Sequence, residues 1–261
     1  MKIGYFQFAP VFGDVESNRS RIADAVRQSD AELLVVPELA TSGYFFSSSA
    51  EVREMAETIP GPTTDALSKA ASYTGSTIIT GLPERDGENF YNSAVVVGPN
   101  GIIGTYRKVH LFNEEKNHFS SGEDGFLLFQ LNGIKVGVLI CFDHMFPEAA
   151  RTLTLKGAQI VCHPSNLVLP EYGQLTSRVR ALENRIFWIL SNRWGHESAH
   201  GQCLCYTGAS QVVDPKGKVL IRAESSSDEI SAVEIDPSLA LDKKVTPLND
   251  LMEDRKPEFY L

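Results

Sequence analysis

IKVGVLICFDHMFPEAAR, residues 134–151, predicts a buried strand that passes through a tight turn into a helix. Its first part is an apolar run of strand length that ends at Cys141. Pro147 and Glu148 follow and are typical of the first turn of a helix. Such a turn can expose a nucleophile while the backbone N–H groups after it point toward a developing oxyanion. Cys141 is therefore a candidate nucleophile, although a buried structural cysteine fits the same pattern.

Strands and helices alternate along the rest of the chain. Apolar runs of strand length lie at 2–9, 32–36, 76–82, 93–97, 134–141, 158–162 and 187–191. Helical patterns lie at 18–28, 63–73, 147–156 and 174–185, and hairpin signals at 99–101, 131–133 and 214–217. About ten to twelve strands are too many for one open sheet. We therefore predict an α/β fold, a four-layer α-β-β-α sandwich of two mixed sheets flanked by helices.

Length and charge limit the function classes. The chain has 261 residues, 43% of them hydrophobic, which fits one domain over residues 1–261. A net charge of -9 and a pI near 5.2 argue against a nucleic-acid partner. The N-terminus lacks a signal-peptide pattern and no apolar run reaches membrane length, so we expect a soluble, cytoplasmic protein without a membrane partner. Residues 236–261 have little periodicity and predict a C-terminal arm that packs at a subunit interface.

The four cysteines do not form a spaced disulfide framework, and we expect all of them to be reduced. Cys203 and Cys205 lie two residues apart and would share one face of a strand, but no second ligand pair stands at zinc-site spacing. We predict that they are buried in packing.

Two charged residues also stand at the ends of predicted strands. Glu38 follows the apolar run ELLVVP, where apolar surroundings would raise its pKa and let it accept a thiol proton. Lys108 ends IIGTYRK, and its ammonium beside a carboxylate and a thiolate would favour both ionised forms and stabilise a substrate oxyanion. Each of these two residues, taken alone, could equally be an ordinary charged residue on the surface. The prediction of a catalytic role therefore depends on both lying close to Cys141.

Three motifs together resemble those of the nitrilase, or carbon–nitrogen hydrolase, superfamily: VVPELATSGY, GTYRKVHLF and GVLICFDHMFPEAAR. The resemblance extends over nearly the whole chain and is especially close to small archaeal members described as nitrilases. It implies that Glu38 is the general base, Lys108 stabilises the intermediate and Cys141 is the nucleophile. Glu115, in HLFNEEK, is similar to a second glutamate that orients substrate beside the nucleophile. The implied reaction is acyl transfer through a thioester, with no metal or organic cofactor, in a homodimer or a higher homo-oligomer.

The family resemblance leaves the substrate open. Phe142 and Asp143 stand where well-defined nitrilases usually have Trp and Glu, which favours a small, aliphatic amide. Small archaeal members with similar residues are nevertheless called nitrilases, so nitriles remain an alternative, as do N-carbamoyl amides. We predict that the substrate pocket is lined by residues that flank the motifs: Tyr44, Phe45, Phe142, His144, Met145 and Asn166. Arg193 could bind a substrate carboxylate or form a structural ion pair.

Residues 196–200, HESAH, match the H-E-x-x-H pattern of zinc proteases by letter. That pattern works on a helix, but Gly195 and Gly201 bracket it here in what we predict to be a loop, and no convincing third ligand follows. We therefore predict no metal site. A binding module with a vestigial cysteine is the other alternative, and a reactive Cys141 would exclude it.

Overall fold

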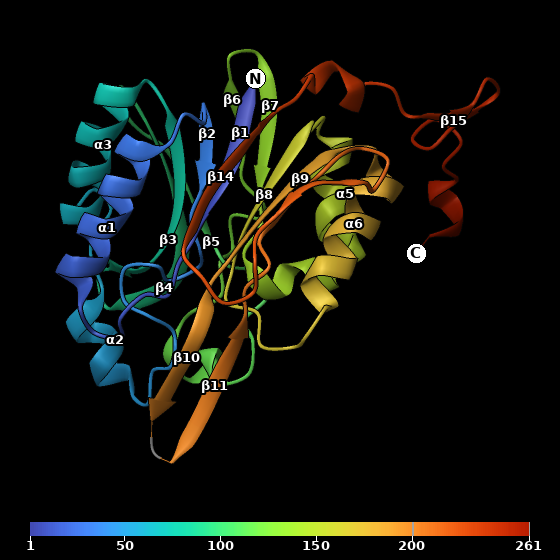
Figure 1. Cartoon of the computed structure of the whole chain (residues 1–261). Coiled ribbons are helices and arrows are strands. Elements are labelled where there is room, and N and C mark those ends of the chain that lie inside the picture. Colours follow the sequence, from blue (N-terminus) through green and yellow to red (C-terminus); the bar gives the residue numbers. More distant parts are fainter. Residues whose placement is uncertain (200, 261) are drawn as a thin grey trace.

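Two sheets packed face to face lie between two layers of helices in the computed structural model, which describes residues 1–199 and 201–260 (Figure 1). The first sheet contains β1 (Lys2–Gln7), β2 (Leu33–Val35), β3 (Thr77–Asp86), β4 (Asn89–Gly98), β5 (Gly101–Arg107) and β14 (Glu229–Glu234). The second contains β6 (Leu128–Leu131), β7 (Ile134–Val138), β8 (Ile160–Ser165), β9 (Phe187–Asn192), β12 (Gln211–Val213) and β13 (Val219–Arg222). The strand orders are β14-β1-β2-β3-β4-β5 and β13-β12-β9-β8-β7-β6.

Both sheets are mixed, as predicted. In the first, β1, β2 and β3 are parallel neighbours, and β14, β4 and β5 join antiparallel. In the second, β7, β8 and β9 are parallel, and β6, β12 and β13 join antiparallel. The predicted α-β-β-α sandwich of two mixed sheets is confirmed.

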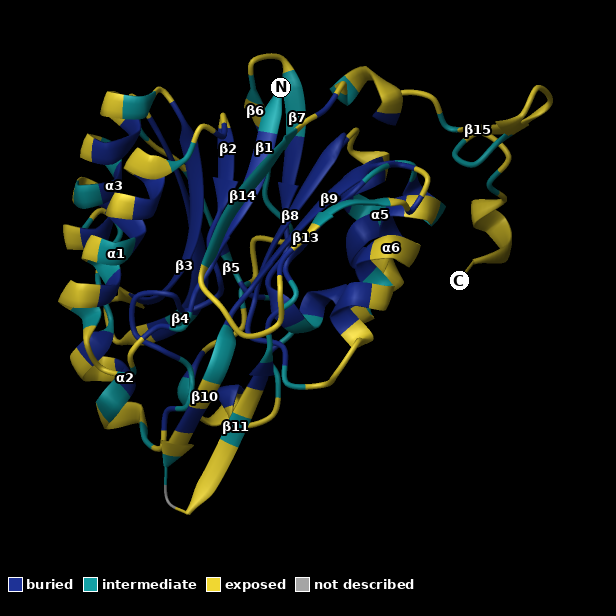
Figure 2. Cartoon of the chain, viewed as in Figure 1, coloured by how far each residue is buried: buried dark blue, intermediate teal, exposed yellow. Residues whose placement is uncertain are grey.

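Helices cover the outer faces of both sheets. The helices are α1 (Val15–Gln28), α2 (Ser49–Met55), α3 (Pro62–Thr74), α4 (Glu115–His118), α5 (Pro147–Leu155) and α6 (Tyr172–Asn184), with the short 3-10 helices η1 (Cys141–Met145), η2 (Pro237–Ala240) and η3 (Pro257–Phe259). Helices α1, α2 and α3 lie on the side of the first sheet, and α5 and α6 on the side of the second (Figure 1). Their outer faces are exposed and their inner faces buried (Figure 2).

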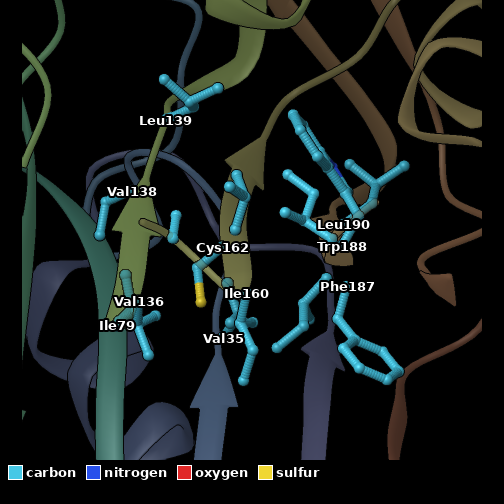
Figure 3. Packing of buried hydrophobic residues seen from close by; sticks show 14 of the residues in the cluster. Val35, Ile79, Val136, Val138, Leu139, Ile160, Cys162, Phe187, Trp188 and Leu190 are labelled. Atoms are coloured by element: carbon cyan, nitrogen blue, oxygen red, sulfur yellow. The ribbon is translucent and has the colours of Figure 1, made fainter. Parts of the chain in front are cut away.

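Alternate side chains of the first sheet enter two different cores, because successive residues of a strand point to opposite faces. Leu34 and Val36 pack toward α1 and α3, whereas Leu33 and Val35 pack toward the second sheet. Figure 3 shows this inner core, where Val35 and Ile79 of the first sheet meet second-sheet residues such as Val136, Ile160 and Phe187. Strands buried on both faces explain the continuous apolar runs in the sequence.

The hairpin of β10 (Trp194–Ala199) and β11 (Gln202–Thr207) projects beyond the two sheets (Figure 1). Leu204 and Tyr206 are partly or fully buried on its inner face, while Cys203 and Cys205 are exposed on the other. The predicted burial of these two cysteines is therefore wrong, because a hairpin that stands off the sheets has only one covered face. Cys141 and Cys162 are buried, and all four cysteines are free.

The C-terminal arm follows β14 and carries β15 (Lys244–Thr246) and β16 (Asn249–Asp250) before η3. It lies away from the two sheets (Figure 1), with Leu248 and Phe259 exposed. Leu261, the last residue of the predicted arm, falls outside the described residues. Within the described residues, no helix has the length and apolar character needed to cross a membrane.

Candidate active site

Four charged or nucleophilic side chains meet between the ends of the two sheets. Glu38 follows β2, Lys108 follows β5, Cys141 begins η1 after β7, and Glu115 begins α4. Glu38 and Lys108 are completely inaccessible to solvent, and Cys141 and Glu115 are almost so. All four residues predicted to be catalytic are therefore brought together in one buried cluster.

Lys108 bridges the two glutamates. Its Nζ lies 2.6 Å from Glu38 Oε1 and 2.8 Å from Glu115 Oε1. Asn92 Nδ2 also donates to Glu38 Oε1, at 2.7 Å, and the Tyr44 hydroxyl donates to Glu115 Oε1, at 2.6 Å. Glu38 Oε2 is buried and has no hydrogen-bond partner among residues 1–199 and 201–260, so this oxygen is free to take a proton.

Burial controls the protonation of the cluster. It raises the pKa of the Cys141 thiol well above its ordinary value; Glu38 adds to this effect and Lys108 opposes it. Burial also raises the pKa of the Glu38 carboxyl, against the opposing charge of Lys108. For Lys108, burial lowers the pKa, but the carboxylates of Glu115 and Glu38 outweigh it and leave the pKa raised. The resting state is thus a neutral thiol beside an ammonium group and a carboxylate that accepts protons readily.

Cys141 occupies a strained turn. Its φ of 41° lies in the left-handed region, which costs a non-glycine residue on the order of 1 kcal/mol or more. Asp143 fixes this turn: its carboxylate accepts from the Ile140 N–H at 2.8 Å and from the Tyr106 hydroxyl at 2.7 Å. His110 Nδ1 lies 2.7 Å from the other carboxylate oxygen of Asp143. The predicted strand-turn-helix junction is present, with Cys141 in a 3-10 turn rather than at the last position of the strand.

Two cavities border the cluster and share part of their walls. The inner pocket touches Cys141 and has a mostly apolar lining that includes Phe142, His144, Met145 and Asn166. The outer chamber, of about 570 Å³, is lined by Tyr44, Phe45 and Glu115 together with residues of the β10–β11 hairpin. Phe112 and Val168 line both cavities. The six predicted pocket residues therefore all lie on these walls, four at the nucleophile and two in the outer chamber.

His144 contributes no cation to the inner pocket. Burial lowers its pKa to about 4, and the nearby charge of Arg180 acts in the same direction. Its Nδ1 lies 2.6 Å from the Thr176 hydroxyl. The imidazole is consequently neutral at pH 7.

Glu197, on the β10–β11 hairpin, is hydrogen-bonded to the segment that forms part of the outer chamber wall. Its carboxylate pairs with Arg193 Nη1 at 2.5 Å and accepts the backbone N–H groups of Tyr44 and Phe45 at 3.2 Å and 2.9 Å. Of the two roles considered for Arg193, the structure supports the ion pair. The zinc-protease pattern needs a helix, whereas residues 196–199 lie in strand β10, where His196 is exposed and Glu197 is buried. The predicted loop is thus wrong for 196–199, and His200 lies outside the described residues.

Sequence analysis missed several polar residues that hold the site. Asn92 donates to Glu38, Asp143 fixes the turn, His163 contacts the Cys141 carbonyl oxygen, and Glu197 holds the chamber. Asn92 and His163 could have been noticed as polar residues inside apolar strands. Their partners could not have been named, because these come from distant segments.

Comparisons with known proteins agree with this geometry. The two mixed sheets packed between helices are the architecture of solved carbon–nitrogen hydrolases. The family model "Carbon-nitrogen hydrolase" matches residues 2–243, and the chain belongs to this family, within the nitrilase superfamily.

Relatives carry both amidase and nitrilase names. The chain is 43% identical to a nitrilase of Pyrococcus abyssi, over 100% of this chain and 99% of that protein. It is 37% identical to an (R)-stereoselective amidase of Pseudomonas sp., over 90% of this chain and 85% of that protein. An amidase from Nesterenkonia sp. AN1, in which acrylamide has added to the active-site cysteine, superposes with a TM-score of 0.82 at 26% identity, over 100% of this chain and 98% of that one. The chain is therefore a carbon–nitrogen hydrolase, and these names do not choose between amides and nitriles.

Proposed function

We propose that this enzyme is an amidase that converts small, uncharged amides to carboxylic acids and ammonia, with Cys141 as nucleophile. The observation that carries the proposal is the unpartnered Oε2 of Glu38 beside a buried thiol, with Lys108 held against the other oxygen of the same carboxylate. This arrangement supplies a base, a nucleophile and a fixed positive charge in one buried site.

The first half of the cycle acylates the enzyme. Glu38 Oε2 takes the thiol proton as the sulfur of Cys141 attacks the amide carbonyl carbon. The resulting oxyanion is stabilised by the ammonium of Lys108 and the backbone N–H of Phe142. Glu38 then gives its proton to the amide nitrogen, the C–N bond breaks, and ammonia leaves behind a thioester on Cys141.

The second half regenerates the thiol. Glu38 accepts a proton from a water molecule while the oxygen of that water attacks the thioester carbonyl carbon. Lys108 and the Phe142 N–H stabilise the second tetrahedral intermediate as they do the first. The C–S bond breaks, the sulfur recovers a proton from Glu38, and the carboxylic acid departs. Glu115 acts on this cycle by holding Lys108 in place, because its Oε1 accepts both the Lys108 ammonium and the Tyr44 hydroxyl.

The pocket chemistry supports an uncharged acyl group. The inner pocket beside Cys141 is lined mainly by apolar side chains, and the imidazole of His144 on its wall is neutral at pH 7. Lys108 is enclosed between two carboxylates, and Arg193 pairs with Glu197, so neither cation is free for a substrate carboxylate. Anionic amides would lose their hydration without gaining a partner.

Nitrile hydrolysis is the second candidate, because a nitrilase of Pyrococcus abyssi is 43% identical over the whole chain. Hydrolysis of N-carbamoyl amides is a third. Ammonia release from butyramide and from butyronitrile, which have the same carbon chain, distinguishes an amidase from a nitrilase. Succinamate tests whether an anionic amide is accepted, and a carbamoyl compound tests the third candidate. The blank is Cys141→Ala, with circular dichroism to establish that it is folded. We expect release from butyramide that vanishes in the variant; release from butyronitrile alone would replace the amidase with a nitrilase.

We also propose that the enzyme is a homodimer in the cytoplasm. Helix α6 exposes an apolar stripe of Tyr172, Leu175, Val179 and Leu182, and the arm exposes Leu248 and Phe259. A second copy of the chain would cover these surfaces, and α6 and the arm lie on the same side of the two sheets (Figure 1). Two exposed free cysteines suit a reducing compartment. Light scattering should give twice the chain mass, and Leu175→Asp should shift it toward one copy; a single-chain mass for the wild type would contradict the dimer.

A further inference from the structure

His163 is a buried histidine that the catalytic cycle above does not use. It lies on β8, completely inaccessible to solvent, between the neighbouring strand β9 and the nucleophile turn. Its Nε2 is 2.8 Å from the backbone carbonyl oxygen of Cys141, and its Nδ1 is 3.3 Å from Nε1 of Trp188. The side chain therefore connects the second sheet to the residue that attacks substrate.

These two contacts fix the tautomer of His163. The indole Nε1–H of Trp188 can only donate, so His163 Nδ1 must accept and carries no proton. The proton of the neutral ring is then on Nε2, which donates to the Cys141 carbonyl oxygen. Burial lowers the pKa of His163 well below its ordinary value, in agreement with a neutral ring.

The hydrogen bond from His163 to the Cys141 carbonyl oxygen also fixes the direction of the Phe142 N–H. The carbonyl of Cys141 and the N–H of Phe142 belong to the same planar trans peptide and point in opposite directions. Holding the carbonyl oxygen against His163 aims the Phe142 N–H to the other side of the turn. In the part of the chain that the structure describes, this N–H has no hydrogen-bond partner. A hydrogen bond to the carbonyl also polarises the peptide and strengthens its N–H as a donor.

The backbone needs such a support. Cys141 has a φ of 41°, a conformation that persists in a non-glycine residue only where its surroundings impose it. Asp143 holds the turn through the Ile140 N–H, on the side before the nucleophile. His163 holds the peptide on the side after it, which is the one that carries the oxyanion donor.

We infer that His163 is a positioning residue for the oxyanion site: its Nε2–H fixes the Cys141–Phe142 peptide so that the Phe142 N–H faces the substrate oxygen. This inference rests on the proposed amide hydrolysis. It separates His163 from the residues that activate the thiol, because it predicts an effect on the oxyanion and none on the nucleophilicity of Cys141.

Two reactions of Cys141 distinguish these effects. Amide hydrolysis develops an oxyanion, whereas alkylation by iodoacetamide displaces iodide at a saturated carbon and develops none. His163→Leu should lower kcat for butyramide about 100-fold, the size typical of losing one oxyanion donor, with KM changed less than about threefold. Its rate of Cys141 alkylation, followed by peptide-resolved mass spectrometry, should stay within about threefold of the wild type.

Companion variants separate positioning from general stability. His163→Gln can still donate at the Nε2 position and accept from Trp188, so it should recover much of the lost kcat. Val26→Ala truncates a buried residue on α1, away from the site, and should lower the melting temperature without changing kcat. If His163→Leu does not fold, Trp188→Phe is the alternative variant. It removes the hydrogen bond to His163 Nδ1, so either tautomer of the imidazole becomes possible, and kcat should fall several-fold with the alkylation rate unchanged.

Three results would overturn the inference. One is an unchanged kcat in folded His163→Leu, another is a parallel loss of hydrolysis and alkylation, and the third is a proton on Nδ1 in ¹⁵N NMR of the wild-type imidazole. A wild-type enzyme that releases no ammonia from any amide would instead refute the proposed function, and the NMR measurement would still decide the tautomer.

Discussion

Replacing His144 by Gln should flatten the dependence of folding stability on pH between about 4 and 6.5. Burial, together with the charges of Arg180 and Lys108, lowers the pKa of His144 from 6.5 to about 4, and Asp143 opposes this change. Between these values the unfolded chain binds a proton at this imidazole and the folded chain does not. The free energy of unfolding therefore falls as the pH is lowered through this window, by up to about 3 kcal/mol from this group.

Urea unfolding at several pH values between 4.5 and 7.5 measures this contribution. The quantity to follow is the difference in the free energy of unfolding between wild type and His144→Gln, which cancels the titrating groups that do not interact with His144. This difference should change by about 2 kcal/mol or more across the window. His196→Gln is the matched control, because the same substitution is made there at an exposed histidine. Parallel curves for wild type and His144→Gln would refute the argument.

Three further substitutions test the network around the site. Glu38→Gln should lower the rate of ammonia release by at least about 100-fold in a folded protein, because it removes the base; a loss below tenfold would rule Glu38 out of that role. Tyr44→Phe removes the hydroxyl that donates to Glu115, and chemical denaturation should show a loss of about 2 kcal/mol, whereas unchanged stability would contradict the contact. Arg193→Leu leaves the buried carboxylate of Glu197 without its cation and should cost about 3–5 kcal/mol in the same assay. Stability equal to wild type would mean that the ion pair is not formed in solution.

The sequence was informative wherever one segment alone determines the structure. The apolar run before Cys141 and the Pro147 helix start predicted the strand, the turn and the helix, and Glu38 and Lys108 were recognised as residues at strand ends. Cys203 and Cys205 show the opposite case. The letters QCLCYT fit a strand with either set of alternate residues inside, and the covered face depends on what the hairpin packs against.

The contacts between segments could not be predicted. Glu197 has the letters of a zinc-protease motif, yet it binds backbone N–H groups 152 and 153 residues away in sequence. His163 looks like one polar residue in an apolar strand, and its role follows only from Trp188 on one side and the Cys141 carbonyl on the other. Hydrogen bonds of this kind depend on the register of strands that are far apart in the chain.

The charges of the buried cluster explain why the proposed proton transfer from Cys141 to Glu38 has a low free-energy cost. Burial raises the pKa of both Cys141 and Glu38, so the two shifts partly offset each other in the pKa difference that governs transfer. Moving the proton from the thiol to Glu38 leaves the net charge of the cluster the same, since one anion replaces another beside Lys108. In the proposed cycle, the negative charge then moves from the sulfur to the carbonyl oxygen of the substrate, which the same ammonium group stabilises. On this proposal the buried site moves a negative charge that it already contains, and avoids the larger free-energy cost of introducing a new one.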